Sequence, residues 1–421
     1  MPQISLAIDC AAGDELVAVA EAFKTIVGFA SVVEGEDRVA SAMASGRVLA
    51  RNVTTAIPLP PFDHSAVDGF GVADADLNQP TLRLSVASRT AAGDRMAATI
   101  DAGRAVRLFT GAPIPPGVAG VVLEERCELI GRSLLVTVPI PPGANIRRRG
   151  EDVAAGSVIV EADTILDARH VAMLVAAGVP HVDVRKRLRV AVLSNGNELR
   201  EGGTPLSAGQ IHDANRPMLM ALLAGPAVEV IDLGCHADDP RILAEVFAEA
   251  ARRCDVIVSS GGVAGSDADH VARAVASAGG ALRRFRLAIK PGKPILAGRI
   301  GRTAVLGLPG NPVAALVNFL LFGRALVAAC AGVTPTRAIG QPAIAASPFG
   351  HARGRTEFVP ARICGLSENG MPRVEKLGRG GSARLRPLVL ADGFAEIPAE
   401  AGELEAGSAL AFHPFRAAFA P

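Results

Sequence analysis

The chain has 421 residues, of which 49% are hydrophobic, and its 43 basic and 42 acidic side chains leave a formal net charge of +1. A chain of this length is expected to form roughly two to four domains, and its balanced charge gives no basis for binding nucleic acid or a membrane surface. The absence of Trp and Tyr also argues against base-stacking surfaces, which need aromatic side chains.

The six cysteines include no C-x-x-C pair. Neither a disulfide framework nor a thiolate zinc site is therefore expected, and a reducing, cytoplasmic location is predicted. The first residues lack the basic start and apolar core of a signal peptide. The most apolar long run, residues 314–332, contains Asn318 and Arg324 and is interpreted as a buried helix rather than a membrane span.

In the first half of the chain, the pattern of apolar and turn-forming residues changes at residue 51. Residues 13–50 have apolar side chains at three- and four-residue spacing and are predicted to be helical. Proline and glycine then become frequent, and residues 81–140 contain short β-like runs separated by turn residues. A further β segment is expected over residues 143–166, followed by a helix over residues 167–178.

The second half alternates continuous apolar strands with helices as far as residue 333. Strands of this kind are typical of a doubly wound parallel sheet that is covered on both faces. The helix after the second strand is predicted to begin with Asp238 or Asp239 as N-cap and Pro240 in its first turn. The β-like runs that follow residue 333 predict a C-terminal barrel or sandwich.

These patterns predict a multidomain chain of the α/β plus β class. Domain I combines residues 1–50 with 141–185, domain II is β-rich and covers residues 51–140, domain III is the α/β unit of residues 186–333, and domain IV is a β-barrel-like unit of residues 334–421.

Four polar or glycine-rich loops are expected at one edge of the parallel sheet, where ligands bind beyond the carboxyl ends of the strands. These loops are SNGNEL (194–199), GCHADD (234–239), SSGGVAGSDAD (259–269) and AIKPGKP (288–294). The prolines of the last loop restrict its backbone. Its lysines, Lys290 and Lys293, form a stiff positive pair suited to an anion.

The glycine-rich loop is interpreted as a phosphate site. Ser260, Gly261 and Gly262 leave backbone amides able to point into a concavity, and the helix that follows adds positive potential. An ordinary tight turn is the simpler interpretation of this loop alone, but the lysines predicted on the same edge favour the phosphate. The loop is not G-x-G-x-x-G, so a dinucleotide site is not supported.

Three carboxylates, Glu198, Asp238 and Asp269, are predicted at three separate strand ends. Each alone is typical of a solvated loop residue or a helix cap. Carboxylates beside an anion repel it unless a hard cation bridges the two, and Mg²⁺ does this with carboxylates, waters and substrate oxygens. Their coincidence with the glycine loops therefore predicts a Mg²⁺ site.

Rigid polar loops also occur outside the α/β unit. Asp63 and Asp68 lie in FDHSAVDGFG, and further loops cover residues 110–117 and 146–152. The three consecutive arginines from Arg147 are by themselves typical of a solvated face. A site shared between domains, or between subunits, would give these loops a common purpose.

Eight motifs in this order resemble those of one known family. They are PPFDHSAVDGF, TGAPIPPG, NIRRRGED, SNGNEL, GQIHDAN, SSGGVAGSDAD, AIKPGKP and LPGNPVAAL. The chain is identified on these motifs, over residues 10–415, as a member of the MoeA family of molybdopterin molybdenumtransferases, which is related to the E domain of gephyrin and of its plant counterpart.

The resemblance implies the last step of molybdenum cofactor synthesis. Adenylylated molybdopterin would be the substrate, molybdate would supply the metal, and Mg²⁺ would assist the hydrolysis that releases AMP. The resemblance also implies an elongated homodimer in which the cleft lies between domain III, a MogA-like adenylyltransferase fold, and the partner subunit's domain II. An adenylyltransferase and apo-molybdoenzymes would be further partners.

The resemblance also assigns roles to residues. The expected catalytic residues are Asp68, Asp152, Glu198, Asp238, Asp269 and Lys290. The expected binding residues are Thr110, Lys290, Pro309, Pro312 and Ser382, joined by Ser260, Gly261, Gly262 and Lys293 from the predicted anion site. The expected Mg²⁺ ligands are Glu198, Asp238 and Asp269.

Some positions depart from the family pattern, and they leave two other functions open. The departures are Ala119, Asn197, Ala264, Gly265, Ser266 and Arg286. Asn197 stands where the family usually has aspartate, and the three residues from Ala264 alter the glycine loop. These changes favour weakly a non-catalytic carrier that delivers finished cofactor. The preceding adenylyl transfer is a third hypothesis, against which the extra β domains and LPGNPVAAL argue.

Overall fold

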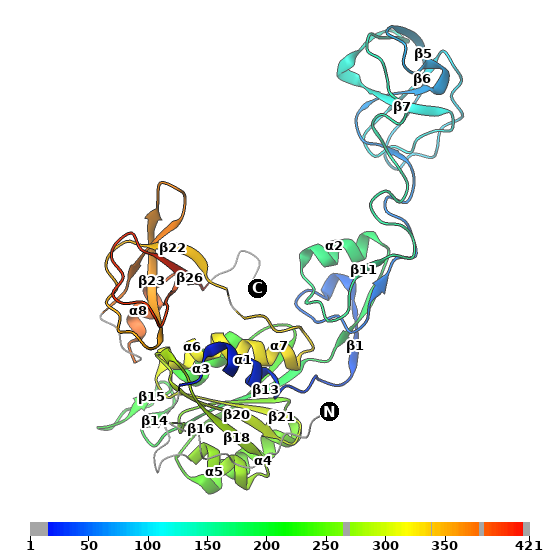
Figure 1. Cartoon of the computed structure of the whole chain (residues 1–421). Coiled ribbons are helices and arrows are strands. Elements are labelled where there is room, and N and C mark those ends of the chain that lie inside the picture. The colour runs from blue at the N-terminus through cyan, green and yellow to red at the C-terminus, as the bar shows by residue number, and fades with distance from the viewer. Residues whose placement is uncertain (1–15, 264–269, 338, 379–382, 416–421) are drawn as a thin grey trace.

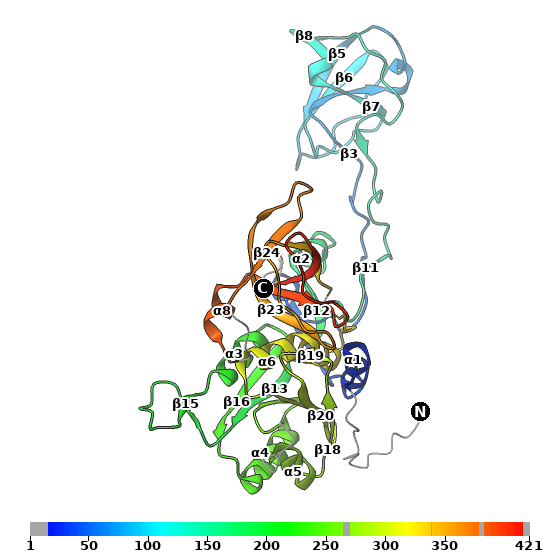
Figure 2. The ribbon, with the colours of Figure 1, turned by 60° about the vertical axis from the view of Figure 1, so that its left-hand side comes forward.

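The computed structural model describes residues 16–263, 270–337, 339–378 and 383–415. Figures 1 and 2 show an elongated molecule in which the α/β unit and the C-terminal barrel lie together, while a β-rich unit stands away from both at the end of a narrow connection. The chain reaches this distal unit and returns from it through a small intermediate unit. The connection therefore consists of two segments of the chain, one leading to the distal unit and one leading back.

The first described segment lies in the α/β unit, and the chain then crosses to the intermediate unit. Helix α1 (Val19–Val27) buries Ala22 and Ile26 in the core of the α/β unit. In the intermediate unit, β1 (Glu36–Ala40) pairs with β12 (His181–Arg185), β2 (Val53–Thr54) pairs with β11 (Val158–Val160), and α2 (Ala168–Ala176) packs nearby. The helix predicted over residues 167–178 is confirmed, and Asp167 caps it.

The prediction of helix throughout residues 13–50 is wrong beyond α1. Its second half forms β1 and a short 3₁₀ turn, Ser41–Met43. The reason is tertiary: β1 pairs in antiparallel register with β12, so that Glu36 lies opposite Arg185. This partner lies far along the chain, and the local spacing of apolar residues carries no information about it.

The distal unit is a β sheet in the order β7-β4-β6-β5-β9-β8, as the short apolar runs predicted. Its strands are β4 (Gly69–Ala73), β5 (Leu82–Thr90), β6 (Arg104–Leu108), β7 (Val118–Leu123), β8 (Cys127–Ile130) and β9 (Ser133–Val136), with 3₁₀ turns at Asp74–Asp76 and Glu124–Arg126. At its base β3 (His64–Ser65) pairs with β10 (Ile146–Arg147). Phe70, Val72 and Leu134 are buried in its core.

The α/β unit is built on a sheet in the order β16-β13-β17-β21-β20-β18. Its strands are β13 (Leu188–Asn195), β16 (Val228–His236), β17 (Val256–Ser260), β18 (Ala281–Arg286), β20 (Pro294–Ile300) and β21 (Thr303–Leu308). The first four strands of this order are parallel, as predicted. β20 and β18 run antiparallel on either side of the predicted KPGKP loop, and neither was predicted as a strand.

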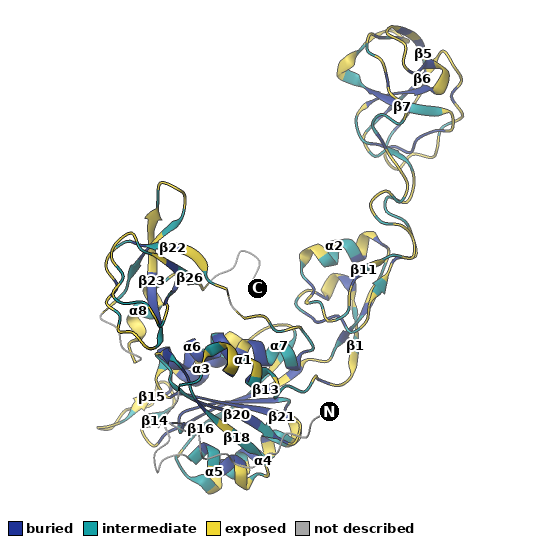
Figure 3. Ribbon diagram, viewed as in Figure 1, coloured by how far each residue is buried: buried dark blue, intermediate teal, exposed yellow. Residues whose placement is uncertain are grey.

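Helices cover both faces of this sheet, as predicted for a doubly wound fold. Val190 and Val192 of β13 face one core with α3 (Asn215–Leu223), whereas Ala191 and Leu193 face a second core with α4 (Pro240–Arg253) and α5 (His270–Ser277). Figure 3 shows the resulting band of buried residues along these strands. Asp239 caps α4, with Pro240 in the first turn, as the sequence predicted.

The apolar run after residue 311 is one continuous helical segment. It consists of α6 (Pro312–Asn318), a π-helical turn (Phe319–Gly323) and α7 (Arg324–Cys330). By length and composition this segment could cross a membrane, but 72% of it is buried inside the protein. It packs against the same sheet face as α1 and α3.

The C-terminal unit is a closed barrel, which confirms the β fold predicted for it. Its strand order is β23-β24-β22-β26-β25, and an additional pairing of β23 with β25 closes the ring. The elements are β22 (Gln341–Ala345), β23 (Thr356–Leu366), β24 (Pro372–Lys376), α8 (Leu385–Leu390), β25 (Gly393–Ile397) and β26 (Ala409–Pro414). β19 (Ile289–Lys290) pairs with β23 and joins the barrel to the α/β unit.

Candidate functional site

A cavity of about 1060 Å³ lies between the α/β unit and the barrel. It is lined by the loops that follow β13, β16, β17 and β21, and by the KPGKP loop. β20 runs antiparallel to β21, so its first residues lie at the edge where the parallel strands have their carboxyl ends. The four loops predicted to meet at one edge therefore do meet there.

The cavity brings together most of the residues predicted to act in the α/β unit. Those that line it are Glu198, Asp238, Ser260, Gly261, Gly262, Lys290, Lys293, Pro309 and Pro312. Asp269, Ser382 and the altered loop positions 264–266 lie outside the described residues. Asp68, Thr110 and Asp152 do not line the cavity, because they belong to the distal unit and its connection.

Asn195 holds three of the loops together. Its side-chain Nδ2 donates a hydrogen bond to Asp238 Oδ1, 2.7 Å away. A Cβ on Gly261 would lie 2.2 Å from the backbone oxygen of Asn195, and one on Gly262 would lie 2.7 Å from its Nδ2. Both glycines also have positive φ, 103° and 64°. The loop therefore needs glycine in order to pack against the end of β13.

Asn215 performs a similar task on the other side of the glycine loop. Its Nδ2 donates to Ser260 Oγ and to the carbonyl oxygen of Gly310, each 2.7 Å away. The Ser260 hydroxyl donates in turn to the carbonyl of Pro309, 3.2 Å away. Asn215 is 6% exposed, so these hydrogen bonds are shielded from water and fix the LPGNP loop relative to β17.

Among the described residues, three cations line the cavity: Lys290, Lys293 and Arg355. Lys290 Nζ lies 3.1 Å from Glu357 Oε1. In the part of the chain that the structure describes, the side chains of Lys293 and Arg355 have no ion-pair partner, so their charges are available to a ligand. A cavity with this composition suits an anion such as a phosphate.

The carboxylates of Glu198 and Asp238 line the same cavity and offer only oxygen donors. A Cβ on Gly196 would lie 2.6 Å from Glu198 Oε2, so the carboxylate rests against this glycine. No group of three or more His, Cys, Asp or Glu side chains forms a metal site among the described residues, which exclude Asp269. Two carboxylates and room for waters fit Mg²⁺, which keeps several waters when it binds to protein.

Asn197 lies beside this cavity rather than in its lining. Its Oδ1 accepts a hydrogen bond from the backbone N–H of Asp238, 3.1 Å away. The side chain thus connects the loop after β13 with the loop that carries Asp238. Aspartate, usual at this position in the family that the sequence resembles, could make the same contact and would add a negative charge.

The distal unit holds a second polar cluster. Asp68 Oδ1 accepts hydrogen bonds from the Thr110 backbone N–H at 2.7 Å and from the Thr110 hydroxyl at 2.8 Å. These bonds, the one from the backbone first, lower the pKa of the Asp68 carboxyl below its ordinary value. Asp152 is exposed in the connection, where its N–H donates to the carbonyl of Leu59. Figures 1 and 2 show the distal unit well separated from the α/β unit of its own chain.

The three consecutive arginines from Arg147 make their contacts within the distal unit and its base. Arg148 pairs with Asp63 at 2.7 Å, and Arg147 pairs with Glu151. The pKa of Asp63 lies below its ordinary value, chiefly because its carboxylate accepts the backbone N–H of Arg149 and despite partial burial. Much of the positive charge in this run is therefore neutralised locally.

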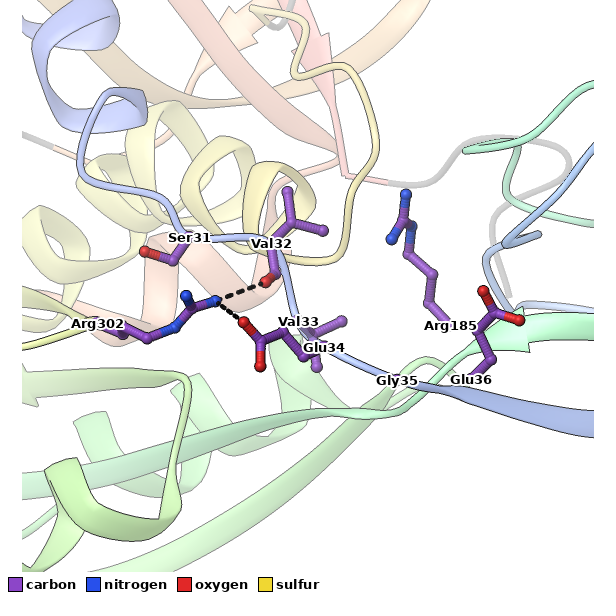
Figure 4. A pocket seen from close by; sticks show the side chains of 8 residues that line it. All are labelled: Ser31, Val32, Val33, Glu34, Gly35, Glu36, Arg185 and Arg302. Atoms are coloured by element: carbon purple, nitrogen blue, oxygen red, sulfur yellow. Dashed lines mark hydrogen bonds and ion pairs between the residues drawn. The ribbon is translucent and has the colours of Figure 1, made fainter. Parts of the chain in front are cut away.

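A separate notch of about 530 Å³ lies at the segment that leads from α1 to β1 (Figure 4). Arg302 pairs there with Glu34 at 2.9 Å, and Arg185 pairs with Asp163, with Nε 3.0 Å from Oδ1. Both arginines already have carboxylate partners, so the notch is a structural junction between units and not a second anion site.

Sequence reasoning missed four residues that shape the main cavity. Asn195 and Asn215 lie in the motifs SNGNEL and GQIHDAN, so their motifs gave a signal. Arg355 and Glu357 lie in a run that was interpreted only as a strand. Their part in the cavity depends on how the barrel docks, which the sequence pattern does not reveal.

Comparison with known proteins identifies matches along nearly the whole chain. Residues 17–178 match the family profile described as MoeA N-terminal region (domain I and II). Residues 191–329 match a probable molybdopterin binding domain, and residues 342–415 match the MoeA C-terminal region (domain IV).

Individual proteins give the same result. The chain is 36% identical over 374 residues to molybdopterin molybdenumtransferase of Haemophilus influenzae, covering 88% of this chain and 92% of that one. It is 33% identical over 376 residues to molybdopterin molybdenumtransferase 2 of Mycobacterium tuberculosis, covering 87% and 92%. The crystal structure of the molybdopterin biosynthesis moeA protein from Pyrococcus horikoshii superimposes with a TM-score of 0.79 at 29% identity, covering 95% of this chain and 100% of that one.

Proposed function

The chain belongs to the MoeA family, and we propose from this premise that it inserts molybdenum from molybdate into adenylylated molybdopterin, with Mg²⁺-dependent release of AMP. The relatives named molybdopterin molybdenumtransferase support a transferase in molybdenum cofactor biosynthesis. The observation that carries the finer proposal is that Lys290, Lys293 and Arg355 line the same cavity as Glu198 and Asp238.

The cations would bind the anionic oxygens of the substrate. Lys290 and Lys293 are held on a proline-stiffened loop, so little entropy is lost when they meet a phosphate or molybdate oxygen. Arg355 enters from the barrel and can form two parallel hydrogen bonds to one oxyanion group. The same charges would stabilise the negative charge that develops on the adenylyl phosphate during hydrolysis.

The carboxylates would hold the metal and orient water. Glu198 and Asp238 would bind Mg²⁺, directly or through water, with Asp269 as the predicted third ligand. Bound Mg²⁺ would supply charge neutralisation at the phosphate oxygens. Asn195 would keep Asp238 in place, because its Nδ2 donates to only one of the two carboxylate oxygens.

We further propose a cytoplasmic homodimer in which Asp68, Thr110 and Asp152 of one subunit complete the cavity of the other. This proposal is supported by the separation of the distal unit from the cavity of its own chain (Figure 1) and by the occurrence of functional family motifs in both places. It would give the Asp68–Thr110 cluster of the distal unit a role in binding the substrate.

The test is incubation of the purified protein with adenylylated molybdopterin, Mg²⁺ and molybdate, with AMP measured by chromatography. Release of AMP that requires both Mg²⁺ and molybdate would support the transferase. Tight binding of molybdopterin without AMP release would contradict it and support the carrier function instead.

A further inference from the structure

A buried acid–base pair lies in the barrel directly behind the cavity. Glu357 is in β23, and its carboxylate Oε2 lies 3.0 Å from His351 Nδ1. The side chains are only 6% and 1% exposed. Glu357 lines the cavity, whereas His351 does not. The pair therefore reaches from the interior of the barrel to the cavity wall.

The other oxygen of Glu357 contacts Lys290. The Lys290 Nζ lies 3.1 Å from Glu357 Oε1, and the lysine side chain is 49% exposed. The backbones support this contact, because β19 and β23 pair in parallel with Lys290 opposite Glu357. The N–H of Thr356 also donates to the carbonyl of Ala288, 2.9 Å away. Glu357 thus links two side chains, His351 inside the barrel and Lys290 at the cavity wall.

The charge state of Glu357 follows from its hydrogen bonds. Burial would raise the pKa of Glu357, but hydrogen bonds from His351 and Lys290, with a smaller contribution from Lys376, outweigh burial and lower it. The carboxylate is therefore ionised and accepts a hydrogen bond from the Nδ1–H of His351. His351 Nε2 is buried without a hydrogen-bond partner among the described residues.

We infer that His351 is a positioning residue for Lys290, acting through Glu357. By holding one carboxylate oxygen, the imidazole fixes the plane of the carboxylate, and the second oxygen then fixes the ammonium at the cavity wall. An ammonium has three donors, so two remain for a ligand while one stays on Glu357. The catalytic consequence of this inference rests on the proposed function, but the positioning itself does not.

This role predicts a separation of kinetic effects. Loss of His351 leaves the charge of Lys290 unchanged, so the ground-state attraction for an anion persists. The ammonium loses its fixed place, and a displaced charge stabilises the transition state less well. The turnover number should therefore fall while KM changes little.

The kinetic test uses three variants. His351→Leu should lower kcat for AMP release about tenfold with KM within about twofold of the parent. His351→Asn, which retains an N–H donor near the position of Nδ1, should keep most of the parent turnover. In a Glu357→Gln background, His351→Leu should lower kcat by less than about a further twofold, because the effect of His351 passes through the Glu357 carboxylate. A full additional loss in that background would indicate a general structural role and overturn the inference.

A second measurement does not depend on turnover. The chain contains five lysines, so reductive ¹³C-methylation gives a simple NMR spectrum, in which Lys290→Arg identifies the Lys290 signal. Relaxation should show the Lys290 methyl groups to be more restricted than those of the exposed Lys24, and His351→Leu should remove this difference. Equal mobility of the two lysines in the parent protein would overturn the inference even if AMP is released. Absence of AMP release with a restricted Lys290 would reject only the proposed function.

Discussion

The side-chain Nδ2 of Asn318 donates a hydrogen bond to the backbone carbonyl of Gly292, 3.0 Å away, and a second to the carbonyl of Ala314 at 2.9 Å. Asn318 is fully buried in α6, so a helix in the core holds the KPGKP loop directly. Gly292 has a φ of 102°, and a Cβ there would lie 2.1 Å from the Asn318 Nδ2. The two residues therefore fit each other closely.

Asn318→Leu should destabilise the α/β unit. The substitution removes the donor and leaves the partly buried Gly292 carbonyl without it, which costs about 1–3 kcal/mol. The measurement is the shift of the urea midpoint, followed by far-UV circular dichroism. Gly292→Ala should also destabilise, and adding Asn318→Ala should recover part of that loss by removing the clash. If Asn318→Leu leaves the midpoint unchanged, the hydrogen bond contributes nothing to stability.

Lys290→Ala should lower AMP release by about a hundredfold or more, because one charge that faces the developing phosphate charge is lost. Lys290→Arg should recover part of the activity, since a guanidinium keeps the charge but not the compact shape of an ammonium. The checks are initial rates and a circular dichroism spectrum that matches the parent. Near-parental rates for Lys290→Ala would remove this lysine from the mechanism.

Asn197→Asp should lower the Mg²⁺ concentration that gives half-maximal AMP release. The new carboxylate keeps the acceptor for the Asp238 backbone N–H and places a negative charge close to the predicted metal ligands, where cation affinity depends on total ligand charge. Glu198→Ala should have a far larger and opposite effect, because it removes a carboxylate from the cavity itself. A Mg²⁺ titration of Asn197→Asp that superimposes on the parent curve would restrict position 197 to supporting the loop.

Two inactive variants should complement each other if the cavity is completed by a second subunit. Asp68→Ala removes the partner of Thr110 in the distal unit, and Lys290→Ala alters the cavity. A mixed dimer contains one cavity in which both residues are intact, so mixing and re-equilibrating the chains should restore up to about a quarter of the parent activity. Asp68→Ala mixed with itself is the control. A monomer in analytical ultracentrifugation, or no restoration, would contradict the shared cavity.

The part of the site that the sequence predicted follows from one rule of sheet geometry. Glu198, Asp238 and Gly261 follow three parallel strands, and the carboxyl ends of such strands share an edge. Continuous apolar strands and helix caps such as Asp239 are local signals, so the α/β unit could be recognised from the sequence.

The features that the sequence did not reveal depend on contacts between distant segments. β1 is a strand because β12 lies beside it, and β18 is a strand because β20 returns along it. The contact of Lys290 with Glu357 likewise exists because the barrel docks on the α/β unit through β19. None of these partners is encoded by the spacing of residues within a single segment.

The cavity between the α/β unit and the barrel is proposed to convert adenylylated molybdopterin. The most direct test of this proposal is a single-turnover experiment with the purified protein and adenylylated molybdopterin, in which AMP is measured with and without molybdate and Mg²⁺. The account predicts stoichiometric AMP release when both are present, and little when either is omitted. Release of AMP at the same rate without molybdate, or no release under any of these conditions, would contradict it.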